Sequence, residues 1–251
     1  MSLPTEQRRR LLREALWVFG LCSVACAVLV QLRPVVGFID ANVHGLIAAI
    51  FLFVPTELII RRKESFTPFG LTHEPLGKGL LVFAAGAALV FPLFASAFYL
   101  YYRQVCAWSV AGTLPLPGQI RRLCSRFVGS AARARLSLTP SYLNMVLTQL
   151  LVVGLPEEYF FRGYLQTRLE QVWPSNRRLL GAPVGPALPA CAALFALGHL
   201  ITDFNGLRLA VFFPGLLFGW MRQLTGSILA GVLFHASSNL VSDLLHRAFF
   251  Q

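Results

Sequence analysis

Apolar residues in this chain are gathered into long runs, which are separated by short stretches rich in arginine and proline. A helix that spans a bilayer needs about 20 mostly apolar residues. Seven runs approach this length: 15–32, 44–60, 79–101, 141–171, 185–201, 207–221 and 227–245. The pattern predicts an all-α fold, a polytopic membrane bundle of about seven to eight transmembrane helices.

The composition agrees with a membrane protein. The chain has 251 residues, of which 56% are hydrophobic and 13% are charged, whereas a soluble domain carries about a quarter charged residues. A net charge of +11 raises the possibility of nucleic acid. The arginines fall between apolar runs, however, and no polar fold is visible that could carry a basic groove. The expected partner is therefore the lipid bilayer, with no nucleic acid.

The five cysteines show no metal-ligand spacing, and no disulfide framework can be argued from them. Cys22, Cys26 and Cys191 lie inside apolar runs, where we expect small buried hydrophobes. The polar and basic residues 5–13 precede an apolar run without a small-residue cleavage site, which predicts an uncleaved first membrane helix.

Orientation is only partly determined by the sequence. Arginines at 8–13 favour a cytoplasmic N-terminus, and the basic residues 61–63 after two crossings agree. A third crossing then places 103–140 outside, although this segment has six arginines and no acidic residue. Either it lies against the membrane or it hides a further partial crossing, which would invert the C-terminal half.

The basic segment itself has two interpretations. Leu123, Phe127 and Val128 are interleaved with its arginines, which favours an amphipathic interfacial helix on anionic lipid. The alternative is a solvated basic loop. We divide the chain into N-terminal membrane helices with this loop (1–140) and a catalytic helical core (141–251), within a single structural domain overall.

Charged residues interrupt the fourth apolar run at Glu157, Glu158 and Arg162. Ionisable residues inside a membrane are usually functional. Glu158 and Arg162 are four residues apart and share a helix face, whereas Glu157 is rotated by about 100°. One carboxylate can therefore pair with arginine while the other serves as a general base. The competing interpretation is a structural ion pair at a helix end.

Two later runs each carry one histidine. Phe195 and His199 share a face of the fifth predicted helix, and His235 and Asn239 share a face of the seventh. Each histidine taken alone could be an interfacial or packing residue without a catalytic role. Two acids, two histidines and an asparagine in apolar helices are costly unless they converge, so we expect an active site inside the bundle.

The order Glu-Glu-x-x-x-Arg, Phe-x-x-x-His and His-x-x-x-Asn resembles the CAAX prenyl protease and bacteriocin-processing (CPBP or Abi) family of intramembrane proteases. The resemblance covers roughly residues 141–245 and fills all motif positions. It implies a peptide hydrolase in which Glu157, assisted by His199, activates water. His235 and Asn239 would then stabilise the oxyanion. Glu158 would assist catalysis or, with Arg162 and Phe195, support the site.

The cofactor, the substrate and the compartment are less determined. Glu157, His199 and His235 could ligate zinc, but there is no His-Glu-x-x-His, so zinc and purely glutamate-driven chemistry both stay open. The resemblance implies cleavage near the C-terminal end or membrane anchor of a membrane-associated protein, in a bacterial inner membrane. A sorting, myxosortase-like role is one form of this. The alternatives are a non-catalytic scaffold or immunity protein with the same fold, or a transporter, although no repeat is visible.

Overall fold

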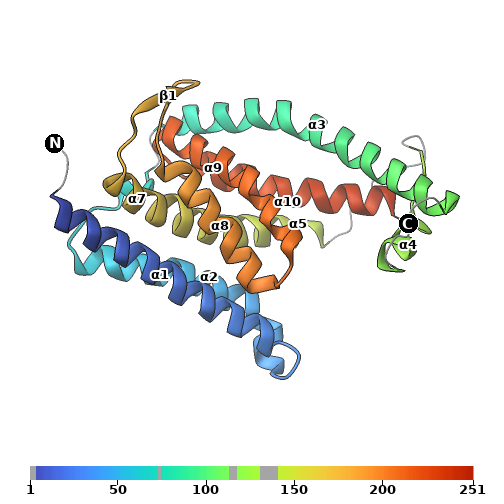
Figure 1. The fold of residues 1–251 in the computed structure, drawn as a ribbon, viewed down its shortest axis with the longest axis horizontal. Coiled ribbons are helices and arrows are strands. Elements are labelled where there is room, and N and C mark those ends of the chain that lie inside the picture. Colours follow the sequence, from blue (N-terminus) through green and yellow to red (C-terminus); the bar gives the residue numbers. More distant parts are fainter. Residues whose placement is uncertain (1–3, 73–74, 113–117, 131–140, 251) are drawn as a thin grey trace. The chain divides into compact units, whose positions relative to one another are not determined.

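A computed structural model describes residues 4–72, 75–112, 118–130 and 141–250 of the chain. Helices account for almost all of this described part, and one two-stranded hairpin is its only sheet (Figure 1). The predicted all-α membrane bundle is confirmed. Each of the seven predicted apolar runs falls on a helical segment.

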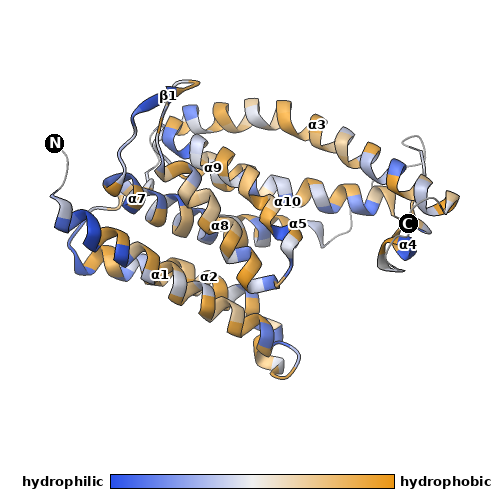
Figure 2. Cartoon of the chain, viewed as in Figure 1, coloured by the Kyte–Doolittle hydropathy of each residue, from blue (hydrophilic) through white to orange (hydrophobic). Residues whose placement is uncertain are grey.

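The first three helices are long and apolar. They are α1 (Thr5–Leu32), α2 (Gly37–Arg61) and α3 (Leu76–Ala111). By length and composition, each could cross a membrane. Most of the residues along them are hydrophobic (Figure 2), and large apolar side chains such as Trp17 and Phe53 are exposed. Side chains of this kind are suited to contact with lipid rather than water.

The fourth predicted helix is one helical run with two widened, π-helical segments. Its parts are α5 (Tyr142–Leu147), η3 (Thr148–Gly154), α6 (Leu155–Glu158), η4 (Tyr159–Leu165) and α7 (Gln166–Val172). π-Helical turns are rare and are frequently found at functional sites. They flank the segment that carries Glu157 and Glu158 on either side. The spacing of apolar residues in the sequence does not distinguish these π-helical segments from α-helix.

The remaining helices are α8 (Ala187–Asp203), the 3₁₀ segment η5 (Gly206–Val211), α9 (Phe212–Thr225) and α10 (Leu229–Phe249). Before them, β1 (Arg177–Leu179) and β2 (Ala182–Val184) form an antiparallel hairpin that the sequence did not predict. Its two turn residues, Leu180 and Gly181, both have positive φ, at 48° and 84°. This is the backbone that a tight two-residue hairpin requires.

The chain forms two compact units. Unit 1 comprises residues 1–83 and 150–235, and unit 2 comprises 84–149 and 236–251. Helices α3 and α10 each contribute to both. The division predicted from sequence, at residue 140, stays a prediction.

Unit 1 is built around aromatic side chains of the fourth helical run. Phe160 stacks on Phe51 of α2 at 4.6 Å between ring centroids, and Phe161 meets Phe195 of α8 edge-on at 5.0 Å. Cys22, Cys26 and Cys191 are free and buried in this unit, as predicted. These contacts hold α1, α2 and α8 against the segment that carries the acidic motif.

A buried arginine secures one end of unit 1. Arg168 of α7 donates two hydrogen bonds to Glu64, at 2.7 and 3.1 Å, and lies against the rings of Phe69 and Tyr164. The Tyr164 hydroxyl in turn donates to Glu14 of α1 at 2.9 Å. The network joins α1, α7 and the segment after α2.

Unit 2 contains two features that the sequence did not reveal. The aromatic cluster of Phe98, Phe249 and Phe250 packs against the three apolar residues assigned to a lipid interface, Leu123, Phe127 and Val128. These three side chains are therefore partly buried within the protein, and the described part of the basic segment contains one short helix, α4 (Gly118–Cys124). Its interfacial location stays a prediction. Residues 113–117 and 131–140 of the basic segment lie outside the described part.

The second feature concerns the cysteines. Cys106 near the end of α3 forms a disulfide with Cys124 of α4, a pairing that could not be argued from the sequence. The two residues are 18 positions apart and match no short motif. Their pairing depends on α4 folding back on α3, which residue spacing does not reveal.

Candidate active site

The predicted ion pair is present and fully buried. Glu158 Oε1 lies 3.1 Å from Arg162 Nη1, and the two side chains are 0% and 1% exposed. Glu157, one residue earlier, is 17% exposed. The two adjacent carboxylates therefore occupy different environments, one enclosed within the protein and the other at its edge.

Arg162 is held on several sides. Its guanidinium lies over the ring of Phe195 at 4.1 Å and that of Phe218 at 5.0 Å, and Nη2 donates to the carbonyl of Gly215 at 3.3 Å. A Cβ atom on Gly215 would come within 3.3 Å of Nη2. Helices α8 and α9 together thus form a fitted site for this cation.

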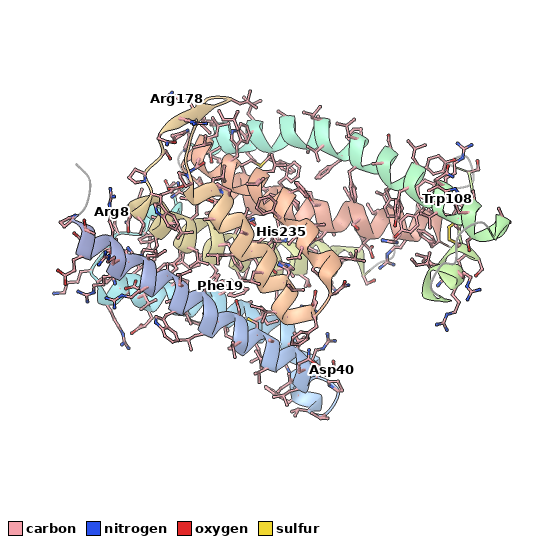
Figure 3. All side chains as sticks on the ribbon, viewed as in Figure 1. Arg8, Phe19, Asp40, Trp108, Arg178 and His235 are labelled. Atoms are coloured by element: carbon pink, nitrogen blue, oxygen red, sulfur yellow. A yellow bond between two sulfur atoms is a disulfide. The ribbon has the colours of Figure 1, made fainter. Side chains whose placement is uncertain are left out.

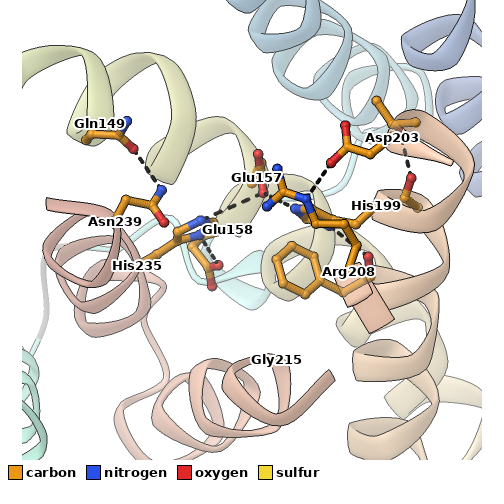
Figure 4. Close-up of polar contacts among 12 residues, drawn as sticks. Gln149, Glu157, Glu158, His199, Asp203, Arg208, Gly215, His235 and Asn239 are labelled. Carbon is orange, nitrogen blue, oxygen red and sulfur yellow. Dashed lines mark hydrogen bonds and ion pairs between the residues drawn. The ribbon is translucent and has the colours of Figure 1, made fainter. Parts of the chain in front are cut away.

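Glu158 has a second partner that the sequence did not reveal. Its Oε1 accepts a hydrogen bond from His235 Nδ1 at 3.0 Å (Figure 4). A carboxylate held by arginine can only accept, so Nδ1 carries the proton and Nε2 is left facing away from Glu158. Phe218 stacks on the His235 ring at 5.2 Å. Glu158 therefore orients His235 in addition to pairing with Arg162.

Both histidines direct Nε2 toward Glu157. Glu157 Oε2 is 4.0 Å from His199 Nε2 and 3.9 Å from His235 Nε2, and it is buried without a hydrogen-bond partner among the described residues. His199 Nδ1 donates to the carbonyl of Phe195 at 3.0 Å, which fixes its tautomer too. Polar atoms separated by more than about 3.5 Å are often bridged by water. The two distances from Glu157 Oε2 are in the range that a bridging water would span.

Asn239 lies in unit 2, one turn after His235 on α10. Its amide donates to Gln149 Oε1 at 2.8 Å, and Gln149 also belongs to unit 2. The structure therefore brings together Glu157, Glu158, His199 and His235 within unit 1, and gives Asn239 a partner of its own.

The metal hypothesis can be tested against these distances. Ligands of a tetrahedral zinc lie about 2.0–2.1 Å from the metal and hence about 3.3–3.4 Å from one another. Glu157 Oε2 is 3.9–4.0 Å from both imidazole nitrogens. No group of three candidate ligands among the described residues meets the geometry for a metal ion. The donor types suit zinc, but their spacing in this structure does not fit it.

Sequence reasoning missed several residues around the carboxylates. Gly231 of α10 lies so close to Glu158 that a Cβ atom there would be 2.8 Å from Oε2. Phe218 and Gly215 on α9 enclose His235 and Arg162. None of the three stands out in an apolar run. Gln149 could have been found, because it is a polar residue in the otherwise apolar stretch before the acidic motif.

Comparison with known families gives one match. Residues 139–241 match the family model for Rce1-like proteins, described as type II CAAX prenyl endopeptidase Rce1-like. The matched segment covers less than half of the chain, and over it the chain is similar to Rce1-like endopeptidases. No curated protein and no solved structure matches the chain.

The Rce1-like segment contains every residue of the candidate site. It begins just before α5 and ends within α10, so that Glu157, His199 and Asn239 all fall inside it. This confirms the resemblance noted from the three motifs, because the matched model describes CAAX prenyl endopeptidases. The assignment of individual roles to these side chains rests on the geometry above.

Proposed function

We propose that this protein is an intramembrane endopeptidase in which Glu157 activates a water molecule to hydrolyse a peptide bond. The observation that carries the proposal is the convergence of Glu157 Oε2 with His199 Nε2 and His235 Nε2, at 4.0 and 3.9 Å. The match of residues 139–241 to a family model of CAAX prenyl endopeptidases supports it. Transporters also use buried carboxylates and histidines, but no internal repeat in the sequence supports that alternative.

The proposed chemistry begins with a water held between these three atoms. Glu157 removes a proton as the water oxygen attacks the peptide carbonyl, and later delivers a proton to the leaving amine as the C–N bond breaks. His199, with its proton fixed on Nδ1, presents a lone pair at Nε2 and assists in placing the water.

Oxyanion stabilisation requires hydrogen-bond donors. His235 already uses Nδ1–H for Glu158, so its Nε2 can donate only when the ring is doubly protonated. The carboxylates of Glu157 and Glu158 lie beside the ring, and their negative charge would stabilise the doubly protonated imidazolium. Asn239 follows one turn later on the same helix, and its amide is the second donor that we propose.

The proposed substrate is a membrane-associated protein that is cut near its C-terminal end or membrane anchor. A bacterial cytoplasmic membrane is the proposed location, and a sorting role is the proposed form of the reaction there. The alternative, a scaffold or immunity protein with the same fold, predicts that the carboxylates are dispensable for every proteolytic readout.

The test compares membrane-protein termini by mass spectrometry in cells that carry the wild type, Glu157→Gln or His199→Ala. Glu6→Gln and His44→Ala are matched controls, because both residues are exposed. We expect new C-termini with the wild type and both controls, and their loss with both site variants. A farnesylated CAAX peptide, added to purified protein, tests the prenyl substrate separately. Unchanged termini in both site variants would overturn the proposal.

A further inference from the structure

The sequence gives two opposite answers for the side of the membrane on which the end of α3 lies. Basic residues 8–13 and 61–63 place the N-terminus and the segment after α2 in the cytoplasm. Three candidate crossings then bring the end of α3 outside. The six arginines of 103–140 argue for the cytoplasm instead.

The Cys106–Cys124 disulfide decides between these answers. It ties the last part of α3 to α4 within unit 2, and is drawn beside Trp108 in Figure 3. Disulfides persist in oxidising compartments and are rare in the cytoplasm, where thiols are kept reduced. The remaining three cysteines are buried and free, so the one bonded pair is confined to this end of the molecule.

Aromatic residues indicate that the part of α3 around Cys106 lies at a membrane surface. Tyr99, Tyr101, Tyr102 and Trp108 surround Cys106 along the helix, and Tyr101 and Trp108 are 58% and 42% exposed. Tyrosine and tryptophan are enriched where a helix leaves the hydrocarbon core. With 36 residues, α3 is about 54 Å long, well beyond the roughly 30 Å core. Its last turns therefore extend past the bilayer interior.

We propose that the C-terminal end of α3, together with α4, lies on the oxidising, extracytoplasmic side of the membrane, and that the disulfide holds the basic α4 there. The two thiols lose two protons and two electrons as the S–S bond forms. A thiol–disulfide oxidoreductase of that compartment supplies the oxidant, because its own disulfide is reduced to two thiols in the exchange.

The end of the chain follows α4 to the same side. Val128, four residues after Cys124, donates its backbone N–H to the carbonyl of Phe249 at 3.0 Å. Phe127 and Phe250 form a β-bridge beside it, and Phe98 of α3 packs against both Phe249 and Phe250. A tag after residue 250 should therefore be extracytoplasmic, whereas an N-terminal tag should be cytoplasmic. This inference does not depend on the proposed protease activity.

The first measurement counts thiols in the full chain, after acid trapping of cells and alkylation of the denatured protein with a polyethylene glycol maleimide. We expect three modified cysteines, rising to five after reduction. Cys106→Ser should free Cys124 and raise the unreduced count to four, whereas Cys191→Ser should lower it to two. Peptide mass spectrometry of the unreduced wild type identifies the linked pair without any variant.

The second measurement locates the two termini in spheroplasts of a bacterial host treated with an added protease. We expect loss of a C-terminal tag from intact spheroplasts, and loss of an N-terminal tag only after lysis. Five free thiols in the trapped wild type would overturn the proposal. A C-terminal tag that stays protected until lysis would overturn it equally.

Discussion

At the scale of single residues, one carboxylate oxygen organises the candidate site. Glu158 Oε1 forms an ion pair with Arg162 at 3.1 Å and accepts a hydrogen bond from His235 at 3.0 Å. The sequence predicted the first contact, because four-residue spacing places Glu158 and Arg162 on one helix face. It could not predict the second, since His235 is 77 positions away. In the proposed mechanism, Glu158 is therefore a positioning residue, and Glu157 is the acid that would face the reacting water.

The two glutamates should respond differently to removal of charge. Breaking a buried ion pair costs about 3–5 kcal/mol, because the partner is left uncompensated. Glu158→Gln should therefore lower both thermal stability and activity, while Glu157→Gln should lower activity alone. Thermal unfolding of the purified proteins in detergent measures the first effect, with Glu6→Gln as control. Equal destabilisation by the two substitutions would contradict the division of roles.

Gly231 offers a second test of how Glu158 is placed. A methyl group at this position would lie 2.8 Å from Glu158 Oε2, closer than real Cβ contacts, so the carboxylate must move. We expect Gly231→Ala to reduce peptide cleavage at least about tenfold, since small displacements in an active site have large effects on rate.

Gly20 is the matched control for that substitution. It lies within α1, and nothing is within 4 Å of a Cβ added there. Gly20→Ala should keep full activity and should stabilise the helix by up to about 1 kcal/mol. If Gly231→Ala were as active as Gly20→Ala, the proposed placement of Glu158 would be wrong.

At the scale of elements, apolar length was sufficient to find the helices but not their contacts. The runs at 15–32 and 44–60 fall within α1 and α2, because a long apolar segment has little alternative in a bilayer. The Arg177–Val184 hairpin was missed, since its turn depends on positive φ at Leu180 and Gly181. The Cys106–Cys124 bond was missed because it depends on how α4 folds back on α3.

Arg168 tests whether buried charge holds the elements of unit 1 together. It is 1% exposed and pairs with Glu64, which is 31% exposed. We expect Arg168→Gln to lower the free energy of unfolding by about 2–4 kcal/mol, less than for a fully buried pair because Glu64 is partly solvated. Thermal unfolding measures the loss.

Arg178 provides the control for this change. It is exposed on the β1 strand, and Arg178→Gln should shift the unfolding temperature little. A destabilisation by Arg168→Gln no larger than that of Arg178→Gln would show that the network contributes nothing to folding.

At the scale of the whole molecule, the sequence predicted the helical membrane fold and which polar side chains would meet. Charged residues are rare in this chain, so Glu157, Glu158 and Arg162 stand out against the apolar background. Their convergence with His199 and His235 was expected, because isolated polar groups in a bilayer are costly. The place of Asn239, in a different unit from the carboxylates, was not.

The wide spacing around Glu157 leads to a prediction about metal. Because its distances to the two imidazole nitrogens exceed those of zinc ligands, we expect purified protein to carry far less than one zinc per chain. Activity should survive a chelator. Metal analysis of the purified protein tests the zinc content, and cleavage assays with and without chelator test whether activity depends on a metal. Stoichiometric zinc, lost together with activity, would contradict a purely glutamate-driven reaction.

The central claim is that Glu157 is the base that activates water for peptide hydrolysis. The most direct measurement is the rate at which purified, liposome-reconstituted protein cleaves a substrate identified from the membrane-protein termini. General base catalysis contributes about 10²–10⁴-fold to rate. We therefore predict that Glu157→Gln cleaves at least about a hundredfold more slowly than Glu6→Gln, with an unchanged unfolding temperature. A Glu157→Gln protein that cleaves as fast as Glu6→Gln would contradict the account.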